Sequence, residues 1–122
     1  MKKRSCERFQ IPGVTVFLKK RSLLFNTKFP DDYFPVLDLS RGGARFLSNH
    51  KFTPGTDMTV RFDIPGHQTT PEILASICWI SRNPEASYRY QTGISFNPYG
   101  PGKADNPLNI LQFFEVIEEG LH

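Results

Sequence analysis

The sequence predicts a mainly β fold, a small closed antiparallel barrel that ends in one α-helix. Three observations support this class. Short apolar segments alternate with polar residues at a period of two, which is the pattern of half-buried strands. Turn-forming residues separate these segments at close intervals, as in small barrels, where closure removes unpaired strand edges. After residue 106 the apolar period changes from that of a strand to that of a helix.

Seven segments are candidate strands. Alternation is clearest in residues 58–64 and 88–96, where apolar positions are separated by single polar or small residues. Residues 72–82 are richer in apolar side chains and predict a longer, more buried strand. Within it we expect Cys78 in the core or the barrel wall, and Trp79 in the core. The shorter candidates are residues 13–20, 23–25, 34–39 and 44–47.

Turn residues mark the ends of these segments. Proline presets its own φ angle and glycine tolerates positive φ, so pairs of the two predict tight turns. Proline stands beside glycine, asparagine or aspartate in five such segments, at residues 29–32, 54–55, 65–66, 83–84 and 98–102.

The C-terminal segment predicts a helix over residues 106–120. Asn106 is expected to cap the helix, with Pro107 at its first position and Gly120 at its end. One apolar stripe should pack on the barrel, and Leu111 and Phe113 widen it. The residues of this stripe are Ile110, Phe114, Ile117 and Leu121.

Length and composition predict one domain spanning residues 1–122. A chain with 39% hydrophobic residues can bury a single core. We expect a flexible basic tail in residues 1–10, the barrel in 13–97 and the helix in 106–120. No apolar run reaches the length of a membrane span, and the N-terminus lacks the apolar region of a signal peptide. A soluble, cytoplasmic protein that does not insert into membranes is expected.

Charge is distributed unevenly along the chain. Residues 1–28 carry eight Lys or Arg against one Glu, a net charge of +7, whereas the remaining 94 residues have a net charge of −4. A basic segment joined to a mildly acidic body favours an anionic partner held at one end of the molecule. The alternative without a specific function is a solvated terminus that keeps the protein in solution. This alternative is the better interpretation for Lys2 and Lys3.

Two short motifs carry most of the functional information. Arg4 and Arg8 form an RxxxR pattern, and two guanidinium groups at this spacing suit bidentate binding of phosphate or of a guanine edge. Asp38, Ser40 and Gly43 form a DxSxxG pattern at a strand boundary. In this pattern Asp38 supplies hydrogen-bond acceptors, Ser40 supplies a hydroxyl, and Gly43 lets a ligand approach the backbone closely. The purely structural alternative is a polar strand end in which the glycine pair at residues 42–43 makes a bulge or turn.

These motifs resemble those of the PilZ domain, a bacterial receptor module for cyclic di-GMP. The resemblance runs from Arg4 to about Phe96 and includes the glycine-rich segment at residues 39–44, the strand containing Trp79, and Gly93 to Phe96 at the end of the barrel. It implies a six-stranded antiparallel barrel, often followed by a C-terminal helix. It also implies that the protein binds cyclic di-GMP and passes the signal to a downstream protein partner.

The resemblance also implies roles for single residues. Arg4 and Arg8 would grip phosphates and guanine edges, and Asp38, Ser40 and Gly43 would line the surface on which a guanine lies. Three further residues are candidate contacts: Lys3, Arg41 and Gly42. A basic residue at the position of Lys3 accompanies an intercalated pair of ligands in this family, but lysine cannot stack or fork as arginine does. The number of bound ligands is therefore open.

Two alternatives remain from other functional classes. Aromatic residues interleave with the basic N-terminal segment, as on a stacking surface for single-stranded nucleic acid. The aromatic residues concerned are Phe9, Phe17, Phe25, Phe29, Tyr33 and Phe34. The second alternative is a PilZ module that binds proteins without nucleotide. Neither a catalytic arrangement nor metal-ligand spacing is evident among the three histidines, so we expect no enzyme, no metal and no cofactor.

Overall fold

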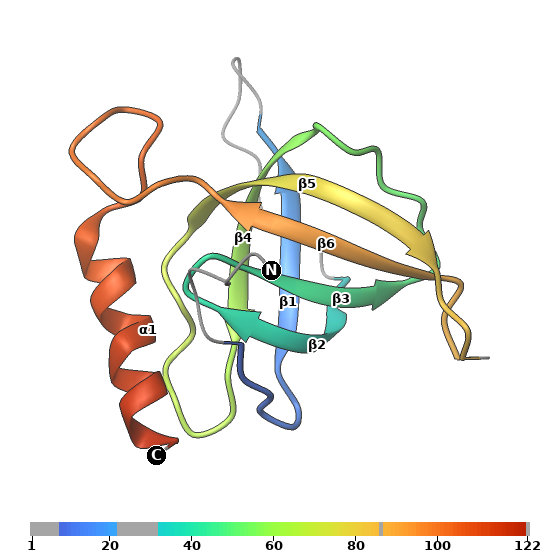
Figure 1. Ribbon diagram of the computed structural model, residues 1–122, viewed down its shortest axis with the longest axis horizontal. Helices are drawn as coiled ribbons and strands as arrows, with labels where there is room; N and C mark the ends of the chain where they lie inside the picture. The colour runs from blue at the N-terminus through green and yellow to red at the C-terminus, as the bar shows by residue number, and fades with distance from the viewer. Residues whose placement is uncertain (1–7, 22–31, 86, 122) are drawn as a thin grey trace, which may run out of the picture.

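The structure is a closed barrel of six antiparallel strands followed by one helix, as the sequence predicts (Figure 1). It is a computed structural model that describes residues 8–21, 32–85 and 87–121. Neighbouring strands follow the order β1-β2-β3-β6-β5-β4 around the barrel. The elements are β1 (Thr15–Lys20), β2 (Phe34–Ser40), β3 (Gly43–Ser48), β4 (Asp57–Asp63), β5 (Ile73–Arg82), β6 (Tyr90–Phe96) and α1 (Leu108–Gly120).

Six of the seven predicted strands are present, and the seventh, at residues 23–25, lies outside the described residues. Alternation determines which side chains face inward, because successive residues of a strand point to opposite faces. The innermost side chains include Val16, Phe46, Val60, Phe62 and Ile77. Two predicted turns are also confirmed, since Gly55 and Gly66 have positive φ.

A bulge in β5 overturns the expectation that Trp79 belongs to the core. The register of β5 against β6 shifts between Ile77 and Trp79, so Trp79 pairs with Gly93 on the outer side of the wall. The indole lies over Gly93, where an added Cβ would clash with it, and the side chain is only partly buried. Cys78 sits at the bulge and is exposed, so it is a residue of the barrel wall and not of the core. A bulge adds one residue to one strand and thereby breaks strict alternation.

Helix α1 packs on the barrel through the predicted stripe. Ile110, Phe114 and Ile117 are buried, and the ring of Phe114 stacks on Phe96 of β6 with centroids 5.7 Å apart. Leu121, the expected last member of the stripe, is 48% exposed. The helix thus covers one end of the barrel, as Figure 1 shows. No helix among the described residues is long and apolar enough to cross a membrane.

The N-terminal end of α1 differs from the prediction, whereas the C-terminal end agrees with it. The residue at the N-cap is Pro107, and no side chain caps the helix. Asn106 is fully buried, and its amide bonds to barrel backbone instead: Leu74 N–H donates to its Oδ1 at 2.7 Å, and its Nδ2 donates to the carbonyls of Leu74 and Asn97. Gly120 is the last helical residue, and Leu121 follows it as C-cap. Tertiary hydrogen bonding decided the role of Asn106, because a buried amide must satisfy its polar atoms.

Candidate functional site

The candidate site lies on the outer face of the β2–β3 hairpin. Arg41 and Gly42 form the turn, so Ser40 pairs with Gly43 and Asp38 pairs with Arg45. A register shift between Val36 and Asp38 precedes these pairs. Because the intervening pair of Leu39 and Ala44 is buried in the core, Asp38 and Arg45 project from the other face of the sheet.

Asp38 is held by two arginines. Arg45 donates from Nε to Asp38 Oδ2 at 2.7 Å, and its Nη2 lies 2.6 Å from the same oxygen. Arg8 Nη1 lies 3.7 Å from that oxygen, which is an ion pair but too long for a hydrogen bond. The Asp38 side chain is only 7% exposed. Two guanidinium groups therefore share one buried carboxylate, and the cluster keeps one net positive charge.

A backbone bridge fixes the position of Arg8. Phe9 N–H donates to the carbonyl of Leu39 at 2.9 Å, and Leu39 N–H donates back to the carbonyl of Phe9 at 3.0 Å. The Phe9 side chain also packs against the core. This bridge places the second arginine of the RxxxR motif beside Asp38, whereas Arg4 and Lys3 lie outside the described residues.

The charged cluster opens into a polar pocket. It has a volume of about 490 Å³ and is lined by Arg8, Gln10, Asp38 and Arg45. Its size is in the range typical of small-ligand sites, and its lining is almost entirely polar. An excess cation with several unshared N–H groups suits an anion such as phosphate. The structure thus brings one residue of each motif, Arg8 and Asp38, to the same pocket.

The Ser40 hydroxyl is engaged within the hairpin. It accepts a hydrogen bond from Gly42 N–H at 3.1 Å and approaches the carbonyl of Gly43 at 3.4 Å. The side chain is buried, and serine hydroxyls commonly stabilise turns in this way. Ser40 therefore stabilises the β2–β3 turn beside the pocket, and this role does not depend on a ligand.

Gly43 has a structural requirement of its own. A Cβ at this position would clash with the carbonyl oxygen of Ile94 in β6. Glycine thus permits the close approach of β3 to β6, and its φ is not in the left-handed region. Of the glycine pair, only Gly42 lies in the turn, together with Arg41, whereas Gly43 is the first residue of β3. The structural alternative therefore holds for Gly42 and not for the pair.

The Arg41 side chain extends toward the helix and is not among the residues that line the pocket. Its guanidinium pairs with Glu118 at 3.3 Å and with Glu115 at 3.9 Å on α1. The hydroxyl of Tyr99 donates to the Arg41 carbonyl at 2.6 Å. The variable residue of the DxSxxG motif therefore connects the β2–β3 turn to the C-terminal part of the chain.

Sequence reasoning missed Arg45, Gln10 and the outward Trp79. Arg45 could have been found, because a two-residue turn at residues 41–42 places residues 38 and 45 opposite each other. Arg45 in turn pairs with Gly93, which pairs with Trp79, so an indole surface lies two strands away from the pocket. The bulge that turns Trp79 outward leaves no simple signal in the sequence.

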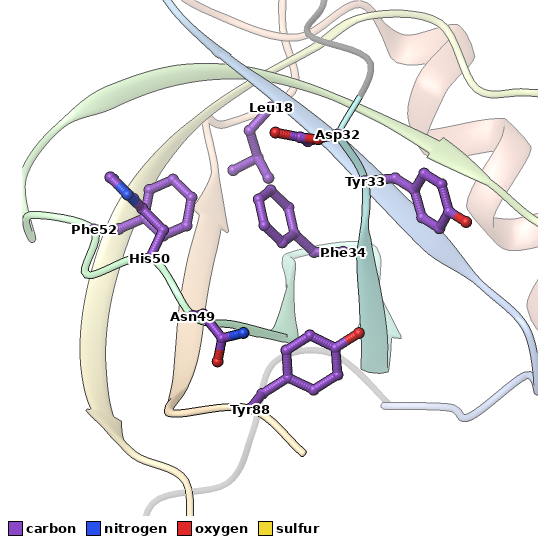
Figure 2. A pocket seen from close by; sticks show the side chains of 8 residues that line it. All are labelled: Leu18, Asp32, Tyr33, Phe34, Asn49, His50, Phe52 and Tyr88. Atoms are coloured by element: carbon purple, nitrogen blue, oxygen red, sulfur yellow. The ribbon is translucent and has the colours of Figure 1, made fainter.

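A second pocket lies beyond the end of β3 and the start of β2, and Figure 2 shows its side chains. Its volume is about 560 Å³. The rings of Phe34, Phe46 and Phe52 pack together with centroids 5.5–5.8 Å apart, and His50 lies against Phe52. None of its lining residues belongs to either motif; they are Leu18, Asp32, Tyr33, Phe34, Asn49, His50, Phe52 and Tyr88.

Comparison with known proteins agrees with the fold and the motif positions. The sequence model of the PilZ domain matches residues 2–108, which include both motifs, all six strands and the first residue of α1. No curated protein matches the chain with significance. Among the described residues, no group of His, Cys, Asp or Glu could hold a metal ion. The chain therefore belongs to the PilZ domain family, whose members are receptor or adaptor modules, typically for cyclic di-GMP.

Proposed function

We propose that this protein is a cyclic di-GMP receptor that signals to a protein partner. The observation that carries the proposal is the convergence of Arg8 and Asp38, from opposite motifs, on one open pocket with excess positive charge. Cyclic di-GMP carries two phosphates and two guanines. A site for it needs cations for the phosphates, acceptors for the guanine edge and a flat surface for the rings.

The residues around the pocket meet these needs. Arg8 offers its guanidinium to a phosphate or to guanine O6 and N7, and Arg4 would join it from the tail. Asp38 offers a carboxylate to the N–H groups of a guanine edge. The Ser40 hydroxyl stabilises the β2–β3 turn beside the pocket, and Gly43 adds no side chain to the adjacent strand. The Trp79 indole provides an aromatic surface two strands away.

The proposed output is ordering of the tail over the barrel. Residues 1–7 carry three of the chain's 15 Lys and Arg residues and would contact the ligand through Arg4, with Lys3 deciding whether one ligand or an intercalated pair is bound. A tail folded against the barrel would present a new surface to a partner protein. Hydrogen exchange of residues 2–9 tests this step, because ordering predicts slower exchange with saturating ligand. Unchanged exchange despite binding would refute the ordering step alone.

Isothermal titration with cyclic di-GMP tests the receptor function. Wild-type protein should bind with saturation, GTP should not bind, and Arg8→Ala should lower affinity by about tenfold to a hundredfold, since a charge-assisted hydrogen bond contributes about 1.5–3 kcal/mol. The fitted stoichiometry distinguishes one bound ligand from two. Absence of heat and of any shift in Tm would refute the proposal and leave a nucleotide-independent interaction module.

One observation favours the nucleic-acid alternative. Phe17 and Tyr33 lie 5.8 Å apart on the outer face of the barrel, the Arg61 guanidinium lies 4.9 Å from the Phe17 ring, and Tyr33 is 62% exposed. Aromatic rings beside an arginine can stack with bases of a single strand. By contrast, Phe34 packs with Phe46 and Phe52 at the second pocket. Salt-dependent binding of oligonucleotides that is lost in Tyr33→Ala would support this second function.

A further inference from the structure

We infer that Arg45 is a positioning residue of the nucleotide site, which aims Asp38 at the guanine edge of the ligand. This inference rests on the proposed function and adds to it a specificity-determining role for a residue outside both motifs. It starts from the unequal way in which the two arginines hold one carboxylate.

The three contacts to Asp38 all end on the same oxygen. Arg45 Nε and Nη2 lie 2.7 and 2.6 Å from Oδ2, and Arg8 Nη1 lies 3.7 Å from it. The short contacts are charge-assisted hydrogen bonds, whereas the long one is a loose ion pair. Arg45 therefore sets the orientation of the carboxylate, and Arg8 contributes little to it.

The backbone explains why Arg45 can hold this orientation. Arg45 and Asp38 are directly opposed in the β2–β3 ladder, so their Cα positions are fixed relative to each other by the barrel. Arg8 precedes the barrel, and its side chain is 39% exposed, so it can turn from Asp38 to a ligand without disturbing a strand. Arg45 stays with Asp38 while Arg8 binds the phosphate.

The geometry also determines what Asp38 can offer. With Oδ2 engaged by Arg45, Oδ1 is the oxygen left to accept hydrogen bonds from the ligand. The Watson–Crick edge of guanine presents N–H donors at N1 and N2 that suit a carboxylate oxygen. Adenine presents an acceptor at N1 and no amino group at C2, so an aligned Asp38 should discriminate against it. Arg45 therefore acts on guanine specificity through Asp38.

The test is a double-mutant cycle measured by titration with cyclic di-GMP and with cyclic di-AMP. Arg45→Lys keeps the positive charge but removes the planar fork that reaches Oδ2 with two N–H groups. It should weaken cyclic di-GMP binding by about tenfold and lower the preference over cyclic di-AMP. Asp38→Ala should weaken binding by at least as much. In the Asp38→Ala background, Arg45→Lys should have almost no further effect, because its action runs through Asp38.

Matched controls separate this role from a structural one. Arg89→Lys alters an exposed arginine just before β6, outside the residues that line the nucleotide pocket, and should bind as wild type does. Arg45→Lys should keep Tm within a few degrees of wild type, because lysine keeps a positive charge beside Asp38 and the Arg45 side chain is 32% exposed. A general structural defect would lower the affinity for both nucleotides equally and leave the ratio of the two affinities unchanged.

Each other outcome overturns the inference in an identifiable way. If wild type binds, Arg8→Ala loses binding and Arg45→Lys binds normally, the receptor function stands and Arg45 has no role. If the losses from Asp38→Ala and Arg45→Lys multiply, Arg45 contacts the ligand directly and the positioning role is wrong. If wild type binds neither nucleotide, the receptor function and this inference fail together.

Discussion

Replacing Gly43 by alanine tests whether this motif glycine serves the fold before it serves a ligand. A Cβ at residue 43 would clash with the Ile94 carbonyl oxygen and would lie 3.2 Å from its carbonyl carbon and 3.4 Å from the Cα of Ser95. All three atoms belong to the backbone of β6, so rotation of a side chain cannot relieve the overlap. Strands β3 and β6 would have to separate where they are paired.

The expected loss of stability follows from this overlap. Inserting a methyl group that forces a backbone shift costs about 2–3 kcal/mol. For a domain of this size each kcal/mol changes Tm by about 3–6 °C, so the midpoint should fall by about 6–18 °C. The assay is thermal and urea unfolding of the ligand-free protein, which measures the fold without any contribution from binding.

Gly120→Ala is the matched control, because an added Cβ there has no neighbour within 4 Å. This substitution should leave stability unchanged or raise it by up to about 1 kcal/mol, since alanine is the better helix former. If Gly43→Ala unfolded at the wild-type temperature, the steric argument would be wrong. Loss of nucleotide binding in such a stable variant would then indicate that Gly43 contacts the ligand surface directly.

Three further predictions concern the helix and the outer wall. Asn106→Ala should lower the free energy of unfolding, measured by urea titration, by about 2–3 kcal/mol. The substitution removes three hydrogen bonds and leaves the Leu74 N–H without its side-chain acceptor. A loss below about 0.5 kcal/mol would contradict this role of Asn106. Arg41→Met should lower stability by about 1 kcal/mol or less, with the difference shrinking in high salt, because its ion pairs to α1 are partly exposed. The same variant should keep its affinity for cyclic di-GMP, whereas a large loss in titration would place Arg41 in the site. Trp79 is the sole tryptophan, so its fluorescence should change on saturation with cyclic di-GMP, and an unchanged spectrum despite binding would separate it from the site.

The agreement between sequence and structure is closest where local pattern decides the outcome. Apolar alternation, together with the apolar run at residues 72–82, predicted strands in the six segments where the structure has them, since side-chain direction along a strand repeats every two residues. The two motifs marked Arg8 and Asp38 as candidate site residues, and the structure places the two in an ion pair at one pocket. The apolar stripe of α1 also packs as its helical period predicts, except for Leu121 at its end.

The predictions that were wrong concern side chains whose position is determined by contacts with residues distant in the sequence. Asn106 has the sequence context of a helix cap, but its side chain bonds to Leu74, 32 residues away. Trp79 follows an apolar run, but a one-residue bulge turns it outward over Gly93. Neither partner is visible in the local sequence, because bulges and buried amide contacts depend on which strands lie side by side.

The sequence by itself determined the fold class, the family resemblance and the identity of the charged residues, because periodicity and short motifs are local properties of the chain. Only the tertiary structure decided which of those charged residues form ion pairs with one another. Strand register places Arg45 opposite Asp38, closer to its carboxylate than the motif residue Arg8. Barrel closure also places β6 against Gly43, which gives this motif glycine a steric role. Both results follow from hydrogen-bonded pairing between strands, which no local pattern specifies.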